Sequence, residues 1–99
     1  MSRWDEDCEA CRRELQAVID GTGRGLQAIR TKHLQGVSDG AKMFKELGDF
    51  IDGQLGKVEN AERVWIQPHT WKEGPRRMGP MLQEVANARQ QIIEFAKQA

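Results

Sequence analysis

A chain of 99 residues, of which 38% are hydrophobic and 30% charged, has room for one domain with one modest core. Its 15 basic and 15 acidic residues balance to a net charge of zero, which argues against a nucleic-acid-binding protein, since such proteins usually carry a basic excess. The apolar runs are too short to span a bilayer and the N-terminus is acidic, unlike a secretory signal, so we expect a cytoplasmic protein without a membrane span.

The first predicted helix covers residues 3–20. Ser2 and Asp5 form a capping pattern, in which the acid reaches back to the amide of the cap residue. Apolar residues then recur in alternating steps of four and three, which places them on one face of a helix. This face consists of Trp4, Cys8, Cys11, Leu15 and Val18. Asp20 and Gly21 end the helix, because glycine is a poor helix former.

A cluster of glycines follows the first helix. Gly21, Gly23 and Gly25 predict a loose connection, since each lowers helix propensity by about 1 kcal/mol relative to alanine. A short basic helix is predicted over residues 24–35, where the apolar period resumes, and Gly36 ends it.

A longer helix is predicted over residues 39–66, with Ser38 as its cap. Its apolar residues recur about every 3.5 positions, which is typical of helices packed lengthwise against one another. They are Ala41, Phe44, Leu47, Ile51, Leu55, Val58, Ala61 and Trp65. Because the helical phase also carries through the earlier glycines, one continuous helix over residues 3–66 stays open as an alternative.

Prolines mark the last third of the chain. Pro68 ends the long helix, and residues 67–79 are predicted to form a proline-rich loop. Pro80 suits the first position of a last helix over residues 80–98, because a proline there removes no helical hydrogen bond. The apolar face of that helix consists of Met81 or Leu82, Val85, Ala88, Ile92 and Phe95.

No segment alternates apolar and polar residues as a half-buried strand does, so the predicted class is all-α. We expect a single domain over residues 1–99, built as a bundle of three to four helices with one long central helix. The first helix is expected to pack on the long helix at Phe44, Leu47, Ile51, Leu55 and Val58. Because apolar residues are few, we expect dimerisation to complete their burial.

Charge is unevenly distributed along the chain. Residues 1–9 carry −3, from Arg3 against Asp5, Glu6, Asp7 and Glu9. Residues 21–36 carry +3, from Arg24, Arg30 and Lys32 without an acid. We interpret these segments as solvated faces that complement each other within the bundle or between subunits.

Cys8 and Cys11 form a C-x-x-C pair in the first helix. Thiols near a helix N-terminus can have a lowered pKa and take part in redox reactions, but a thioredoxin-like motif requires a βαβ setting that this chain lacks. Zinc would need two further ligands, and His33 and His69 are not spaced as a zinc finger requires. Since both cysteines lie on the apolar face, we interpret them as buried packing residues, with a thiol or metal sensor as the alternative.

Neither histidine indicates catalysis. His33 falls where the apolar face calls for a core residue, so we expect it to be half-buried with one ring nitrogen hydrogen-bonded. His69 lies in the proline-rich loop and is expected to be exposed. Because no nucleophile stands at a spacing typical of a triad and the carboxylates occupy polar faces, we predict no catalytic residue, no metal site and no cofactor.

The stretch between Trp65 and Met81 concentrates side chains that are enriched in protein interfaces. Tryptophan and arginine dominate interface hot spots, and methionine adapts to varied surfaces. The predicted partner-binding residues are Trp65, His69, Trp71, Lys72, Arg76 and Arg77. The alternative is that Trp65 and Trp71 fold back and close the end of the bundle.

The sequence therefore predicts a non-enzymatic interaction protein: a regulator, inhibitor or adaptor that docks on another, larger protein and also self-associates. A structural subunit of a larger helical assembly, such as a phage or secretion component, is the first alternative. A sensor of thiol oxidation or metal that uses Cys8 and Cys11 is the second.

Overall fold

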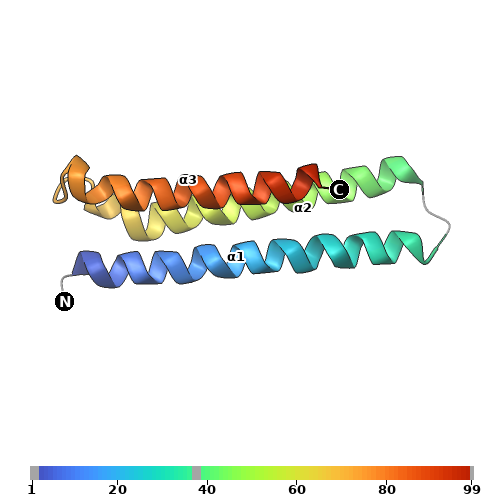
Figure 1. Cartoon of the computed structure of the whole chain (residues 1–99), viewed down its shortest axis with the longest axis horizontal. Helices are drawn as coiled ribbons and strands as arrows, with labels where there is room; N and C mark the ends of the chain where they lie inside the picture. Colours follow the sequence, from blue (N-terminus) through green and yellow to red (C-terminus); the bar gives the residue numbers. More distant parts are fainter. Residues whose placement is uncertain (1–2, 37–38, 99) are drawn as a thin grey trace.

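A computed structural model describes residues 3–36 and 39–98 of the chain, so the predicted caps Ser2 and Ser38 lie outside the described residues. Three long helices run lengthwise beside one another and no strand occurs in the described ranges, which confirms the expected all-α class (Figure 1). The elements are α1 (Arg3–Leu34), α2 (Gly40–Ala61), η1 (Glu62–Ile66), η2 (Gln67–His69) and α3 (Pro75–Lys97). No helix in this part of the chain combines the length and hydropathy that crossing a membrane requires.

Helix α1 runs without a break through the glycine cluster of residues 21–25, so the predicted separation into helices over 3–20 and 24–35 is wrong. All of these glycines keep negative φ angles, as a right-handed helix requires. Gly25 lies directly beneath the ring of Phe50 on α2, and a methyl group at this position would overlap the ring. Packing of α1 against α2 therefore outweighs the low helix propensity of glycine.

The alternative of one continuous helix over residues 3–66 is also wrong. Helix α1 ends at Leu34, and α2 begins at Gly40 and runs back along α1 (Figure 1). The carboxylate of Asp39 caps α2 by accepting a hydrogen bond from the amide of Ala41 at 3.0 Å. The longest helix is consequently α1, and not the central segment that the sequence indicates.

The C-terminal part of α2 passes into a π-helical stretch, η1, and then into a short 3-10 helix, η2. Pro68 lies in η2, where the missing amide hydrogen prevents further α-helical bonding. The helical rod therefore ends close to the predicted boundary at residue 66.

Helix α3 begins at Pro75 rather than at Pro80, so the predicted loop over residues 67–79 is too long. Gly74 precedes the helix in an extended conformation, and Pro75 takes the first helical position, where no hydrogen bond is lost. Pro80 lies in the second turn of α3 and removes a single helical hydrogen bond, which the packing of the helix tolerates.

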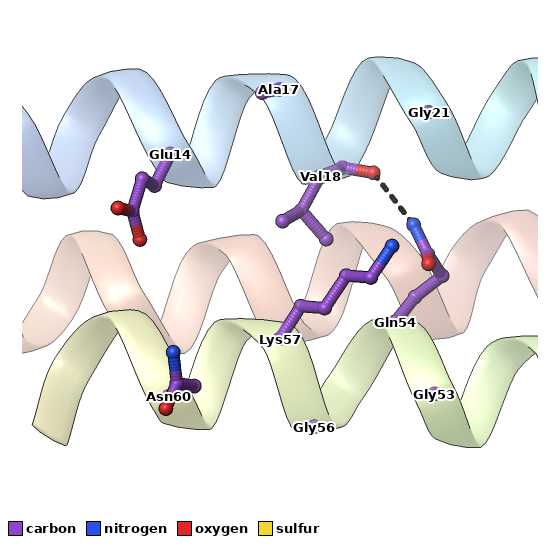
Figure 2. Close-up of a pocket in the computed structure, with 9 residues that line it drawn as sticks. All are labelled: Glu14, Ala17, Val18, Gly21, Gly53, Gln54, Gly56, Lys57 and Asn60. Atoms are coloured by element: carbon purple, nitrogen blue, oxygen red, sulfur yellow. Dashed lines mark hydrogen bonds between the residues drawn. The ribbon is translucent and has the colours of Figure 1, made fainter. Parts of the chain in front are cut away.

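A buried polar link joins α1 to α2 (Figure 2). The side-chain nitrogen of Gln54 donates hydrogen bonds to the carbonyl oxygen of Val18 at 3.2 Å and to the hydroxyl of Thr22 at 3.1 Å. The Thr22 hydroxyl donates to the same carbonyl at 2.7 Å. Since a shift of one helix along the other would leave buried polar groups unpaired, this link fixes their register.

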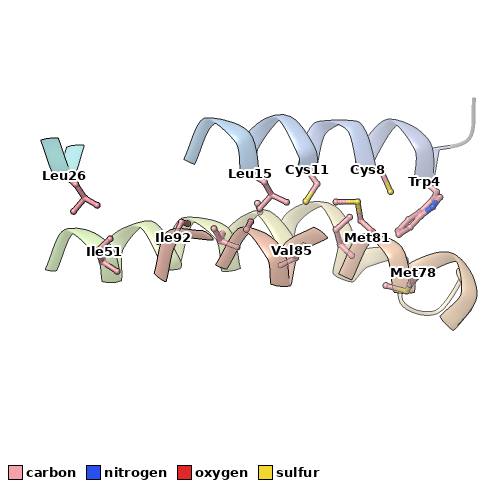
Figure 3. Packing of buried hydrophobic residues seen from close by; sticks show 14 of the residues in the cluster. Trp4, Cys8, Cys11, Leu15, Leu26, Ile51, Met78, Met81, Val85 and Ile92 are labelled. Atoms are coloured by element: carbon pink, nitrogen blue, oxygen red, sulfur yellow. The ribbon is translucent and has the colours of Figure 1, made fainter. Parts of the chain in front are cut away.

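The hydrophobic core lies along the line where the helices meet, and Figure 3 shows the side chains of α1 facing those of α2 and α3. Its buried members are Trp4, Cys8, Cys11, Leu15, Leu26, Leu47, Ile51, Val58, Ala61, Ile66, Met78, Met81, Val85, Ala88 and Ile92. Leu47, Ile51 and Val58 thus share one core with the face of α1, as their spacing predicts. Phe44 is 67% exposed, so its predicted place in this contact is wrong.

The glycines of α1 provide a test of this packing. We expect Gly21→Ala and Gly23→Ala each to raise the free energy of unfolding by about 0.5–1 kcal/mol, because alanine favours the helix and an added methyl meets only ordinary contacts at 3.8 and 3.9 Å. Gly25→Ala should instead lower it by about 1 kcal/mol, because the Phe50 ring has to move. Urea unfolding followed by circular dichroism measures all three; equal stabilisation at residue 25 would contradict the close contact.

Candidate functional site

The predicted partner-binding residues gather at one end of the molecule, where the connection between α2 and α3 meets the start of α1 (Figure 1). His69 is buried there, which makes the expectation of an exposed histidine wrong. Its Nε2 lies 2.7 Å from the Asp7 carboxylate, and its ring meets the Trp4 ring edge-on, with 5.1 Å between the ring centroids. Two residues of α1 therefore hold η2 in place.

A groove of about 440 Å³ lies beside this histidine. Its apolar walls come from Trp4, Val64, Trp65 and Pro68, and its polar rim from Arg3, Asp7, His69, Lys72 and Glu73. Trp65 is partly buried, and its indole Nε1 has no hydrogen-bond partner although it is shielded from solvent. An unpaired buried donor of this kind is unfavourable by about 1–3 kcal/mol.

Trp71 projects into solvent beside this groove, with 96% of its surface exposed. The alternative that Trp65 and Trp71 fold back and close the end of the bundle is therefore wrong for Trp71. Trp65 is partly buried and fits this alternative only in part. The backbone that carries Trp71 is well defined, since the amides of Lys72 and Glu73 donate to the His69 carbonyl at 3.0 and 2.9 Å. A large aromatic side chain is thus displayed on a hydrogen-bonded turn.

The basic residues near Trp71 fall into two groups. Lys72 and Arg76 are exposed. Arg77 instead forms ion pairs with Glu73 at 3.3 Å and with Asp5 at 3.8 Å, and so ties α3 to the start of α1. Of the two neighbouring arginines predicted to bind a partner, Arg76 is the one whose guanidinium faces solvent without a hydrogen bond or ion pair in the described residues.

We refer to Trp71, Lys72, Arg76 and the adjoining groove as the end surface. Sequence reasoning identified its exposed residues, but it missed the part that α1 contributes. The sequence pattern places Trp4 only in the core, and no motif or spacing marks Asp7 as a contact residue. Neither could be found from spacing, because Asp7 stands 62 positions before His69 and their contact depends on how the helices are arranged.

Cys8 and Cys11 are free thiols buried in the core between α1 and α3. Burial raises the pKa of the Cys8 thiol, and burial together with the negative charge of neighbouring groups raises the pKa of Cys11 to about 12. Both thiols are therefore protonated at neutral pH, which is the opposite of a reactive cysteine. The described residues contain no group of three or more histidine, cysteine, aspartate or glutamate side chains that would hold a metal ion.

His33 is partly buried and hydrogen-bonded through one ring nitrogen, as expected. Its Nε2 lies 2.6 Å from the Glu46 carboxylate, to which Lys32 also donates at 2.6 Å. The hydrogen bond from Lys32 and then that from His33 lower the pKa of Glu46. This cluster joins the last turns of α1 to the first turns of α2.

A second groove, of about 540 Å³, runs between α1 and α2 on the side that α3 leaves open (Figure 2). Small residues make it wide, and its polar lining comes from Glu14, Gln54, Lys57 and Asn60. The side-chain nitrogen of Gln54 already donates to α1, so it is not available to a ligand in this groove.

Comparison with protein-family models, curated proteins and solved structures finds no match for this chain.

The contact between Asp7 and His69 leads to a prediction about stability. We expect Asp7→Ala to lower the free energy of unfolding by about 1–3 kcal/mol, because the buried imidazole loses its hydrogen-bond partner. Glu6→Ala is the matched control, since Glu6 is exposed on the same turn, and its effect should stay within about 0.5 kcal/mol. Equal effects in urea unfolding would show that Asp7 does not hold η2.

The raised pKa of Cys11 predicts a pH dependence. In the folded state the Cys11 thiol keeps its proton up to about pH 12, whereas in the unfolded chain it releases the proton near pH 9.0. The contribution of this thiol to stability is therefore complete below pH 9.0 and is lost as the pH rises toward 12. We expect the free energy of unfolding to fall more steeply between these values in the wild type than in Cys11→Ala. Parallel pH profiles of the two proteins would contradict this assignment.

Proposed function

We propose that this protein is a non-enzymatic regulator or adaptor that docks on a larger protein through its end surface. The observation that carries the proposal is Trp71, which is almost fully exposed at a defined position. Tryptophan is the residue most enriched in interface hot spots, since burying its large ring against a partner removes much apolar surface from water. In the isolated chain the Trp71 ring stays exposed to water.

The rigidity of the turn supports the same function. Trp71 follows η2, which is held by the buried pair of His69 and Asp7, and precedes Pro75, which restricts the backbone before α3. Hydrogen bonds to the His69 carbonyl fix the residues between these points. Little conformational entropy is therefore lost when a partner binds, and more of the interaction energy appears as affinity.

The charges around Trp71 indicate what the partner surface contains. Lys72 and Arg76 flank the aromatic anchor and are free to donate charge-assisted hydrogen bonds. The matching surface is an apolar pocket for the indole with carboxylates at its rim. Such complementary charges favour fast association and the selection of the correct partner.

Two further observations bear on the alternatives. The buried, protonated state of Cys8 and Cys11 does not favour a thiol or metal sensor. That both cysteines are free fits action in a reducing compartment such as the cytoplasm. A structural subunit requires a second contact surface, and in this molecule the opposite end is the part available for one.

The test compares Trp71→Ala with Leu82→Ala, a partly exposed leucine on α3 that lies outside the end surface. Each variant and the wild type are used to capture proteins from an extract of the native host, and quantitative mass spectrometry identifies what Trp71→Ala fails to retain. Binding of that protein is then measured by calorimetry. We expect Trp71→Ala to weaken it by about 2 kcal/mol or more at an unchanged melting temperature, and Leu82→Ala to have little effect.

The opposite result has a clear meaning. If Trp71→Ala lowers the melting temperature and leaves the affinity unchanged, the indole is a packing residue and the proposal is wrong. Arg76→Ala separates the two parts of the surface, since a smaller loss of affinity that disappears at high salt is expected of an exposed cation.

A further inference from the structure

The three helices are of unequal length, and this leaves one end of the molecule incomplete. Helix α3 ends at Lys97, beside the middle of α2, whereas α1 and α2 continue together to the turn that connects them (Figure 1). We call residues 24–36 and 39–52 the hairpin tip. Over most of it only two helices run side by side, and a two-layer arrangement of this kind buries only part of each apolar face.

The hairpin tip carries large apolar side chains in solvent. Leu34 is 82% exposed and Phe44 is 67% exposed. Between the tip and the end of α3 lies a groove of about 320 Å³, lined mainly by apolar residues: Leu26, Phe44, Leu47, Gly48, Ile51, Asp52 and Ala96. The groove begins where α3 stops, since Ala96 of the last turn of α3 is one of its lining residues.

The charges of the tip are complementary between its two helices. Residues 24–35 of α1 contain Arg24, Arg30 and Lys32 and no acid, whereas residues 39–52 of α2 contain four acids and two lysines. In a dimer with a two-fold axis across this end, α1 of one copy would lie against α2 of the other, so the basic segment of each copy would face the acidic segment of its partner, in addition to the Lys32–Glu46 ion pair within each chain. The chain as a whole is neutral, and two copies therefore approach without net repulsion.

Two side chains of this region are left without partners inside the chain. Asp52, which lines the groove, makes no hydrogen bond or ion pair within the described residues. The Nη2 atom of Arg30 is buried in the same part of the structure and has no hydrogen-bond partner. Asp52 is exposed and therefore available to a basic side chain of a second copy, whereas the buried Arg30 atom does not lie on the surface.

We infer that two copies of this chain associate through their hairpin tips, each tip covering the groove beyond the end of the other copy's α3. Leu34 and Phe44 are the apolar anchors of this contact, and the basic and acidic helices set its orientation. The hairpin tip lies at the opposite end of the molecule from the segment between η2 and α3, which contains Trp71 (Figure 1), so this contact is separate from the docking function.

The test is sedimentation equilibrium of the full chain over a range of concentrations. We expect the wild type to dimerise, and Phe44→Glu and Leu34→Glu each to raise the dimer dissociation constant at least about tenfold, because a buried unpaired charge replaces an apolar anchor. Since both residues are exposed, circular dichroism should show folded chains throughout. Trp71→Glu is the matched control and should leave dimerisation unchanged.

Two outcomes would overturn the inference. One is a wild type that stays monomeric at every concentration, whatever else binds the tip. The other is a dimer that persists undiminished in Phe44→Glu and Leu34→Glu, since the contact then lies elsewhere. Neither outcome affects the role proposed for Trp71, which is measured by partner binding.

Discussion

The apolar face of α1 is the surface on which every other element of this protein packs. It meets α2 and α3 along its length and η2 at its start, where Trp4 and Asp7 hold His69. Its close contact with α2 depends on glycine at position 25, since a larger residue there would displace the Phe50 ring. Helix α1 spans nearly the whole molecule. What is exposed at each end of the molecule therefore depends on how far α2 and α3 extend along α1.

The two candidate surfaces follow from this geometry. At the start of α1 the chain turns from η2 into α3 within a few residues, and the hydrogen-bonded turn carries Trp71 exposed to solvent. At the other end α3 has 23 residues against 32 in α1, a shortfall of about 14 Å at 1.5 Å per residue. The apolar side chains opposite this shortfall stay exposed. One surface thus arises from a constrained turn and the other from a difference in helix length.

Features that depend on local spacing could be predicted from the sequence. The face from Trp4 to Leu15 and its counterpart on α2 were recognisable because a helix brings residues three and four positions apart together, whatever packs against them. The continuity of α1 was not, since glycine propensity argues for a break and only the contact with α2 reverses it. Burial of His69 depends on a residue from the other end of the chain. The sequence does not decide whether Trp71 is exposed, because a tryptophan suits a core and an interface equally.

The relative placement of the two surfaces affects what the protein would do. In a tip-to-tip dimer the Trp71 surfaces would lie at the two far ends, separated by more than the 54 Å length of one chain. Self-association would therefore leave the docking residues free and would display two of them on one rigid rod. A partner with two suitably spaced sites, or a repeating assembly, would then bind the second end at a high effective concentration, with no new contact required. A monomer that displays one Trp71 surface lacks this gain, so loss of the apolar anchors at the tip would weaken binding to such a partner although they never touch it.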